Sequence, residues 1–229
     1  AHKPIAYNDV LYVAVEAGSS NPEIEAYDIS NPASLNGSTT PLATADIPGA
    51  SDRALSLARK GSVLFVGAAG NGGASEFYAY DISSSGSITL LDELNLTGNP
   101  SVYDIFVKGN YANLATDSTE LVVIDVSSGA NLVVHDEWSA TGSSDAYAVA
   151  ATSTGFYLGR ANSGVDDEYV FVTGSGGIAT DDPLREQGAD MGAVVNAMDI
   201  DPLGCYAFMA TGNSSKELQI RDADTAAVE

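Results

Sequence analysis

Glutamates recur along this chain at an interval that could gather them in one place. Each of them opens a short apolar segment, and the intervals between successive copies are 53, 44, 48 and 49 residues. They are Glu23, Glu76, Glu120, Glu168 and Glu217. A ring of carboxylates suits a hard cation, because such cations prefer oxygen ligands. The same positions also suit a structural role, since a charge where a strand begins fixes register and discourages pairing with foreign edges.

A second acidic position follows five residues after each glutamate. It holds Asp28, Asp81, Asp125 and Asp222, whereas the fourth copy has Thr173. In the first three copies this position is followed by Ser, Asn or Gly within a few residues, and an Asp at such a place accepts backbone N–H bonds in an Asx turn. We therefore interpret these four aspartates as structural residues that end a strand.

Two acidic clusters in the fourth copy are the remaining candidates for metal binding. Asp166 and Asp167 directly precede Glu168, and Asp181 and Asp182 follow it in a Gly-rich stretch. Their spacing is not that of an EF-hand loop, which needs alternating ligands, a central Gly and a terminal Glu. Calcium is the one cofactor that these clusters indicate.

The segments around the glutamates predict strands. A segment of alternating or continuously apolar residues follows each glutamate, and two more precede it; a fourth follows the turn in four copies. Neither these segments nor their connections show a helical period. The third segments are IEAYD at 24–28, FYAYD at 77–81, LVVID at 121–125, YVFVT at 169–173 and LQIRD at 218–222.

Fixed repeats of this length in an all-β chain predict the blades of a β-propeller. In FYAYD both alternating faces are apolar, as expected of a blade that packs against a neighbour on each side. We predict an all-β fold, a five-bladed β-propeller of four-stranded antiparallel blades whose last blade is incomplete. The units of this single domain are residues 1–49, 50–98, 99–142, 143–192 and 193–229, and we expect the domain to be part of a longer surface protein.

The repeat resembles the LVIVD-repeat family of β-propellers. YDISNPASL at 27–35 and VKGNYANLATDSTELVVIDVS at 107–127 carry the resemblance, which is weakest in the fourth unit. The resemblance implies the propeller fold and a role in surface proteins of bacteria or archaea. It brings no catalytic residues, because the family has none that are generally assigned.

The strongly negative charge of the chain limits the kinds of molecule that it can bind. The chain has 31 acidic and 9 basic residues and a net charge of −22. Nucleic acid is excluded because binding phosphates needs the opposite charge, and no apolar run is long enough to cross a membrane. Scattered acid of this density is typical of adaptation to high salt or of a medium rich in divalent cations.

Signatures of catalysis are missing from the sequence. There is no GxSxG elbow, and only His2 and His135 could serve as imidazole bases or ligands. The single cysteine, Cys205, lies in the apolar run CYAFMA and is expected to be a small buried side chain. We expect no enzyme activity.

The expected function is that of an extracellular or cell-surface module for adhesion or interaction, with a protein or a glycan of a cell surface as its partner. Two alternatives remain open. One is the outer domain of a filament, pilus, capsid or spike subunit, in which neighbouring copies complete the last blade by strand addition. The other is an extracellular propeller hydrolase with acids along its channel.

Overall fold

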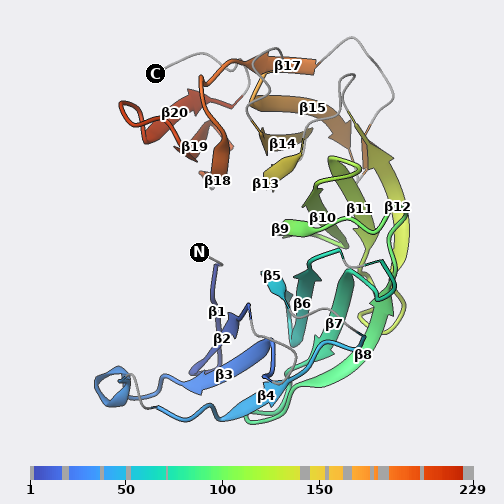
Figure 1. Ribbon diagram of the computed structural model, residues 1–229, viewed down its shortest axis with the longest axis vertical. Coiled ribbons are helices and arrows are strands. Elements are labelled where there is room, and N and C mark those ends of the chain that lie inside the picture. The colour runs from blue at the N-terminus through green and yellow to red at the C-terminus, as the bar shows by residue number, and fades with distance from the viewer. Residues whose placement is uncertain are drawn as a thin grey trace. The chain divides into compact units, whose positions relative to one another are not determined.

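Short β-meanders make up the described part of the molecule. The computed structural model describes residues 3–16, 21–36, 39–49, 53–70, 72–139, 145–152, 155–161, 167–175, 178–179, 186–201 and 204–223. In these residues the strands form five antiparallel sheets in which consecutive strands lie side by side (Figure 1). The only helical segment among them is a 3-10 turn, Pro32–Ser34. No helix within these ranges is long and apolar enough to cross a membrane.

We number the sheets as blades 1 to 5 in chain order. Blade 1 contains β1 (Ile5–Tyr7), β2 (Val10–Ala14), β3 (Ile24–Asp28) and β4 (Ala43–Ala45). Blade 2 contains β5 (Ala54–Lys60), β6 (Val63–Ala68), β7 (Phe77–Asp81) and β8 (Thr89–Leu94). Blade 3 contains β9 (Val102–Lys108), β10 (Tyr111–Thr116), β11 (Leu121–Asp125) and β12 (Val133–Trp138).

The last two blades do not have four described strands: blade 4 has five and blade 5 has three. Blade 4 contains β13 (Ala146–Ala151), β14 (Gly155–Arg160) and β15 (Tyr169–Ser175), and both β16 (Ile178–Ala179) and β17 (Glu186–Ala189) pair with β15. Blade 5 has three described strands, β18 (Val195–Ile200), β19 (Tyr206–Thr211) and β20 (Leu218–Asp222). The all-β prediction is confirmed, and the five sheets are consistent with propeller blades.

The same backbone hydrogen bond occurs once in each blade and shows that the five repeats are structurally equivalent. The carbonyl of each repeated glutamate accepts the N–H of a residue at or just beyond the end of the second strand. The donors are Val15, Ala68, Thr116, Arg160 and Thr211, at N···O distances of 2.7–3.2 Å. Because these five bonds share one register, they align every residue of the second and third strands between the blades.

The chain divides into two compact units, residues 1–102 with 128–132 and residues 103–127 with 133–229. In the first unit, Tyr12, Ile24 and Ala26 of blade 1 pack in one cluster with Leu64, Val66, Tyr78 and Tyr80 of blade 2. In the second unit, Leu121 and Val123 of blade 3 share a cluster with Leu158, Val170 and Val172 of blade 4. The third strands β7, β11 and β15 are buried on both faces in their described side chains, as the apolar runs predicted, whereas β3 and β20 are buried on one face only.

Two buried tyrosines of blade 2 should limit stability in alkaline solution. The hydroxyl of Tyr80 donates to the carbonyl of Asp46 at 3.3 Å, and that of Tyr78 donates to Pro48 at 3.1 Å. Burial, followed by nearby charged groups, raises the pKa of both phenols well above 10.0. The folded state therefore favours the neutral phenols. Their contribution to stability is complete below pH 10 and is lost as the pH rises through the folded pKa.

We expect unfolding above pH 10 to coincide with the rise in tyrosinate absorbance at 295 nm. Tyr80→Phe should make stability less dependent on pH in this range, at a cost of about 0.5–1.5 kcal/mol for the lost hydrogen bond. Tyr206→Phe is the control, because Tyr206 is 40% exposed. Equal changes in the two variants would contradict the role given to burial.

Candidate functional site

The repeated glutamates of blades 1, 2 and 4 are buried and hold main-chain amides. Their Oε2 atoms accept hydrogen bonds from the N–H groups of Ile47, Leu96 and Met191 at 2.7–2.9 Å. Each of these amides lies two residues beyond the last strand of its own blade. The carboxylate thus joins the start of the third strand to the turn that leaves the blade, which is a different structural role from guarding an edge.

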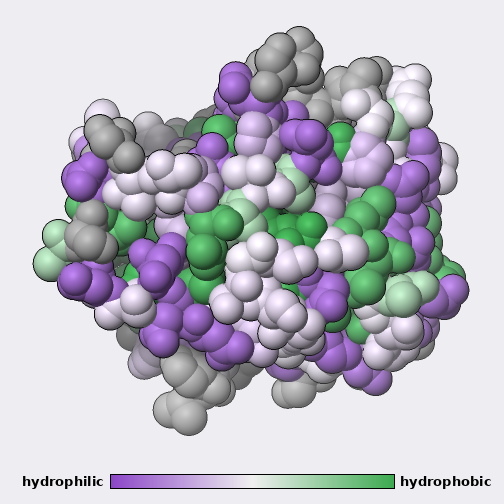
Figure 2. Space-filling model, turned by 90° about the horizontal axis from the view of Figure 1, so that it is seen from below, coloured by the Kyte–Doolittle hydropathy of each residue, from purple (hydrophilic) through white to green (hydrophobic). Residues whose placement is uncertain are grey.

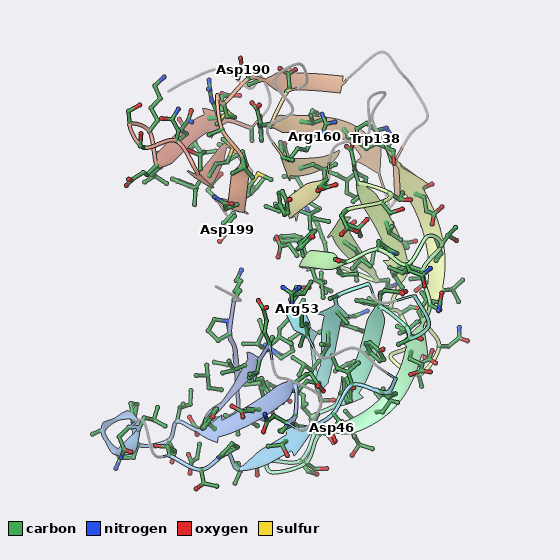
Figure 3. The ribbon with its side chains drawn as sticks, in the orientation of Figure 1. Asp46, Arg53, Trp138, Arg160, Asp190 and Asp199 are labelled. Atoms are coloured by element: carbon green, nitrogen blue, oxygen red, sulfur yellow. The ribbon has the colours of Figure 1, made fainter. Side chains whose placement is uncertain are left out.

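Glu120 of blade 3 has a different main partner. Its Oε1 lies 3.0 Å from Nη2 of Arg160 in blade 4, and both side chains are at most 2% exposed. Nη1 of Arg160 donates to the carbonyl of Asp167 at 3.0 Å. Figure 3 shows Arg160 at the end of β14. The sequence offered one signal for this pair, since Arg160 is the only charged residue at a position that is otherwise Val15, Ala68, Thr116 or Thr211.

Glu217 of blade 5 is exposed, unlike its four counterparts. Its backbone carbonyl still accepts the N–H of Thr211 at 2.8 Å. The described part of blade 5 contains no fourth strand and hence no exit turn that the carboxylate could hold. The glutamate is therefore exposed in the blade that has no described fourth strand and buried in the four blades that have one.

Variants of Glu76 should distinguish the contribution of its hydrogen bond to stability from the contribution of its charge. Burial raises the pKa of this carboxyl above 4.5, and the bond from Leu96 opposes that shift. The neutral form therefore stabilises the fold below pH 4.5, and this contribution is lost as the pH rises through the folded pKa. Glu76→Gln keeps an acceptor oxygen without the charge.

We expect Glu76→Ala to lower the free energy of unfolding by about 1–3 kcal/mol, since it leaves a buried N–H unpaired. Glu76→Gln should be close to the parent at pH 7 and should vary less with pH between 4 and 7. Glu217→Ala is the matched control and should stay within about 0.5 kcal/mol. Chemical denaturation of the four proteins at fixed ionic strength measures this, and equal losses for the two Ala variants would contradict the assignment.

The repeated aspartates of the first three blades form Asx turns. Oδ1 of Asp28, Asp81 and Asp125 accepts the N–H of the residue two positions later at 2.8–2.9 Å. The hydrogen bonds with Ser30 lower the pKa of Asp28. Asp222 ends β20 opposite Tyr206. The Oδ1 atoms of Asp28, Asp81 and Asp125 are therefore occupied by their own turns.

The residues proposed for calcium lie mostly outside the described residues: Asp166, Asp181 and Asp182 are among those not described. Asp167 is described and exposed; its carboxylate lies against Gly188 of β17, where an added β-carbon would come within 1.9 Å of Oδ2. Among the described residues, no three side chains of His, Cys, Asp or Glu gather in a way that could hold a metal ion. Calcium binding stays a prediction.

The expectation that Cys205 is buried is wrong. The residue is exposed and precedes β19 instead of lying inside it. Its N–H donates to Oδ1 of Asp201 at 2.5 Å, and the N–H of Tyr206 donates to the same atom at 2.7 Å. The apolar run CYAFMA misled the prediction because it contains the start of a strand whose one face is exposed.

Apolar side chains gather on that exposed face, which we call the blade 5 face. It consists of Tyr206 and Phe208 on β19 with Leu218 and Ile220 on β20, at 40, 39, 66 and 37% exposure. Phe208 lies directly opposite Ile220, and Leu218 lies opposite Ala210. Tyr206 lies two positions from Phe208, and Leu218 lies two positions from Ile220. Side chains two positions apart on a strand point to the same side, so the four lie on one face of the sheet.

Burial alternates along β19, so that one face of blade 5 is exposed and the opposite face is buried. Ala207 and Met209 are fully buried and share a cluster with Tyr157 and Tyr169 of blade 4. Asp199 of β18 lies beside Phe208 on the exposed side, and Figure 3 shows this aspartate near the end of β18. Blade 5 is therefore packed against blade 4 on one side, while its other side is open to solvent in the described residues.

Other exposed apolar residues lie on outer strands. They include Leu90 and Leu91 of β8 and Val133 and Val134 of β12. Figure 2 shows hydrophobic residues reaching the surface between hydrophilic ones. Charged neighbours such as Asp92 and Asp136 interrupt these strands, and scattered exposed apolar residues are normal for a soluble protein. The blade 5 face differs because its four apolar residues lie together on one face of two neighbouring strands.

One stretch of the chain matches a known family. Residues 101–136 match the LVIVD repeat, which is associated with β-propeller folds. This stretch covers β9, β10, β11 and most of β12 in blade 3, where the sequence resemblance was closest, and the match confirms the resemblance there. No curated protein matches the sequence.

Several solved structures share the fold at low identity. A candidate 6-phosphogluconolactonase of Bacteroides uniformis matches 96% of this chain over 66% of its own, with a TM-score of 0.70 and 14% identity. The computationally designed protein Ika8 matches 98% of this chain over 59% of its own, with a TM-score of 0.67 and 12% identity. The extracellular domain of a one-component system from B. thetaiotaomicron matches 99% of this chain over 26% of its own, with a TM-score of 0.60 and 17% identity. This chain therefore spans about 59–66% of the length of the first two.

Proposed function

We propose that this chain is a non-enzymatic β-propeller module, displayed outside the cell, that acts by binding. The blade 5 face carries the proposal, because it gathers four exposed apolar side chains on one face of a sheet in a chain of net charge −22. Such a charge keeps a protein soluble and separate from its own copies. A conspicuous apolar face on this background favours a specific partner.

The hydrogen-bond partners of the repeated glutamates support the absence of catalysis. Glu23, Glu76 and Glu168 are engaged by backbone amides and Glu120 by an arginine. A catalytic carboxylate must instead reach a substrate or a water. The most regular carboxylates of the repeat are thus committed to holding blades.

Display outside the cell is supported by two observations. Dense surface acid with few cations suits a saline medium, and one structure of similar fold is an extracellular domain. Labelling of intact source cells with an antibody against residues 1–229 tests this. We expect intact and permeabilised cells to be labelled equally, and labelling only after permeabilisation would refute the surface location.

The hydrolase alternative has a specific observation in its favour, namely the similarity to a candidate 6-phosphogluconolactonase. Assaying the purified chain with 6-phosphogluconolactone, with and without divalent cations, tests it. We expect no hydrolysis above that of buffer. Turnover lost on replacing an exposed acid, with stability unchanged, would establish the alternative.

The assembly alternative predicts polymers of the isolated chain. Sedimentation velocity over a range of protein and salt concentrations distinguishes it from the binding module. We expect a monomer at each concentration. Polymers that disappear when Leu218→Asp is introduced would favour an assembly subunit.

A further inference from the structure

We propose that the blade 5 face is the seat of a further propeller blade of the same LVIVD type, carried by the polypeptide to which this sequence belongs. The inference rests on the proposed function, since it names the partner of the same face as a segment of the same polypeptide and leaves binding of a separate molecule to other surfaces of the module. It follows from the register of the repeat, from the packing between the other blades, and from the length of chains with a similar fold.

Three residues of the blade 5 face occupy positions that are buried in the other four blades. The bonds from Thr211 to Glu217 and from Arg160 to Glu168 align Phe208, Leu218 and Ile220 with Tyr157, Tyr169 and Phe171 of blade 4. These blade 4 residues are 0, 0 and 9% exposed, against 39, 66 and 37% in blade 5. The corresponding residues of blade 1 are Tyr12, Ile24 and Ala26, which are at most 1% exposed.

In both units these positions pack against the blade that follows in the chain. Tyr157, Tyr169 and Phe171 of blade 4 share a cluster with Val195, Ala207 and Met209 of blade 5. Tyr12, Ile24 and Ala26 of blade 1 share a cluster with Leu64, Val66 and Tyr78 of blade 2. The blade 5 face therefore has the side chains, in the register, that elsewhere receive a following blade.

A small residue beside this face provides a second, independent similarity to the blades that are followed by another blade. An added β-carbon at Gly67 would come within 2.6 Å of Val102, and one at Gly159 within 2.5 Å of Val195. Each valine begins the first strand of the following blade, so the second strand must be small where that strand crosses it. The same register position in blade 5 is Ala210, which is small and exposed.

The chemistry of the occupant follows from these contacts. Its first strand should begin with a small or branched residue, like Ala54 and Val195, to lie over Ala210. Its second and third strands should offer apolar side chains like Leu64, Val66 and Tyr78. The candidate lactonase and Ika8 leave 34–41% of their own lengths unmatched by this chain, which is room for additional blades.

An extended protein tests the proposal. Asp28 and Asp222 end equivalent strands, so residues 1–222 joined to a second copy of residues 29–98 continue the repeat in register. The addition supplies a fourth strand for blade 5 and then a copy of blade 2. Leu218→Cys in a Cys205→Ser background, made in both the 229-residue and the extended protein, reports solvent access through its rate of reaction with a thiol reagent.

We expect the thiol to react rapidly in the monomeric 229-residue protein and about a hundredfold more slowly in the extended one, because reaction then requires the blades to open. Ser214→Cys, at the exposed turn between β19 and β20, should react rapidly in both. Binding of a hydrophobic dye to the two proteins without these substitutions should fall in the same way, so that the test does not depend on one variant folding.

Three outcomes would overturn the proposal. Slow reaction in the monomeric 229-residue protein would mean that its own chain covers the face, and slow reaction only at high protein concentration would identify a second copy as the partner. Rapid reaction in a folded extended protein would mean that a blade does not fit. Failure of surface labelling on cells would refute the proposed location and leave this result intact.

Discussion

Replacing Arg160 with Met is expected to lower the free energy of unfolding by about 3–5 kcal/mol, because it leaves the buried carboxylate of Glu120 without its cation. The two side chains are 2 and 1% exposed and 3.0 Å apart. They join blade 3 to blade 4, and Arg160 also holds the carbonyl of Asp167. Chemical denaturation at fixed ionic strength measures the loss.

Two further variants distinguish the buried pair from an ordinary one. Arg160→Met combined with Glu120→Leu should recover most of the loss, since an apolar pair of similar size can replace a buried ion pair. Arg53→Met should cost at most about 1 kcal/mol, because the bridge from Arg53 to Glu16 is about half exposed. A loss from Arg160→Met no larger than that from Arg53→Met would contradict the buried pair.

The same substitution at equivalent positions of two blades should have very different effects. Leu121 of blade 3 and Leu218 of blade 5 each follow the repeated glutamate, but they are 0 and 66% exposed. Leu121→Ala should cost about 2–5 kcal/mol, since it empties part of a packed cluster. Leu218→Ala in the 229-residue protein should stay within about 0.5 kcal/mol.

Unfolding free energies of these two variants and of the parent, measured under one set of conditions, test this difference. Comparable losses would show that the blade 5 face is already covered in the 229-residue chain. Leu42→Ala is a further control, because Leu42 is also exposed, at 47%, and lies outside the face.

The strands were predictable from the sequence because their signal is local. FYAYD and LVVID are apolar on both alternating faces, and β7 (Phe77–Asp81) and β11 (Leu121–Asp125) end where the repeated aspartate predicted. The third strands of blades 1 and 5 end at the same register. Period and residue type within five residues were sufficient for this.

The partners of the repeated acids could not be predicted in the same way. Glu76 binds the amide of Leu96, 20 residues later, and Glu120 binds Arg160, 40 residues later. Both contacts depend on how the meander returns and on which blade follows. The sequence left two roles open for Glu76, a cation ligand or a charge that fixes register where a strand begins, whereas its carboxylate is fully buried and accepts the amide of Leu96.

The blade 5 face was missed for the opposite reason. Leu218 and Ile220 have the same character as Leu121 and Val123, which are buried. Nothing in an apolar run states whether a neighbour covers it. The one sequence signal was the lack of an expected fourth strand after Asp222, which marks blade 5 as different without showing which face is open.

The central claim is that the repeated glutamates hold the blades, and amide hydrogen exchange at Ile47, Leu96 and Met191 tests it most directly. These three N–H groups donate to Glu23, Glu76 and Glu168. We predict slow exchange at all three in the parent, and faster exchange at each one when its own glutamate is replaced by Ala. Rapid exchange in the parent, or slow exchange only after a divalent cation is added, would contradict the claim and return the repeated carboxylates to the role of a ligand site.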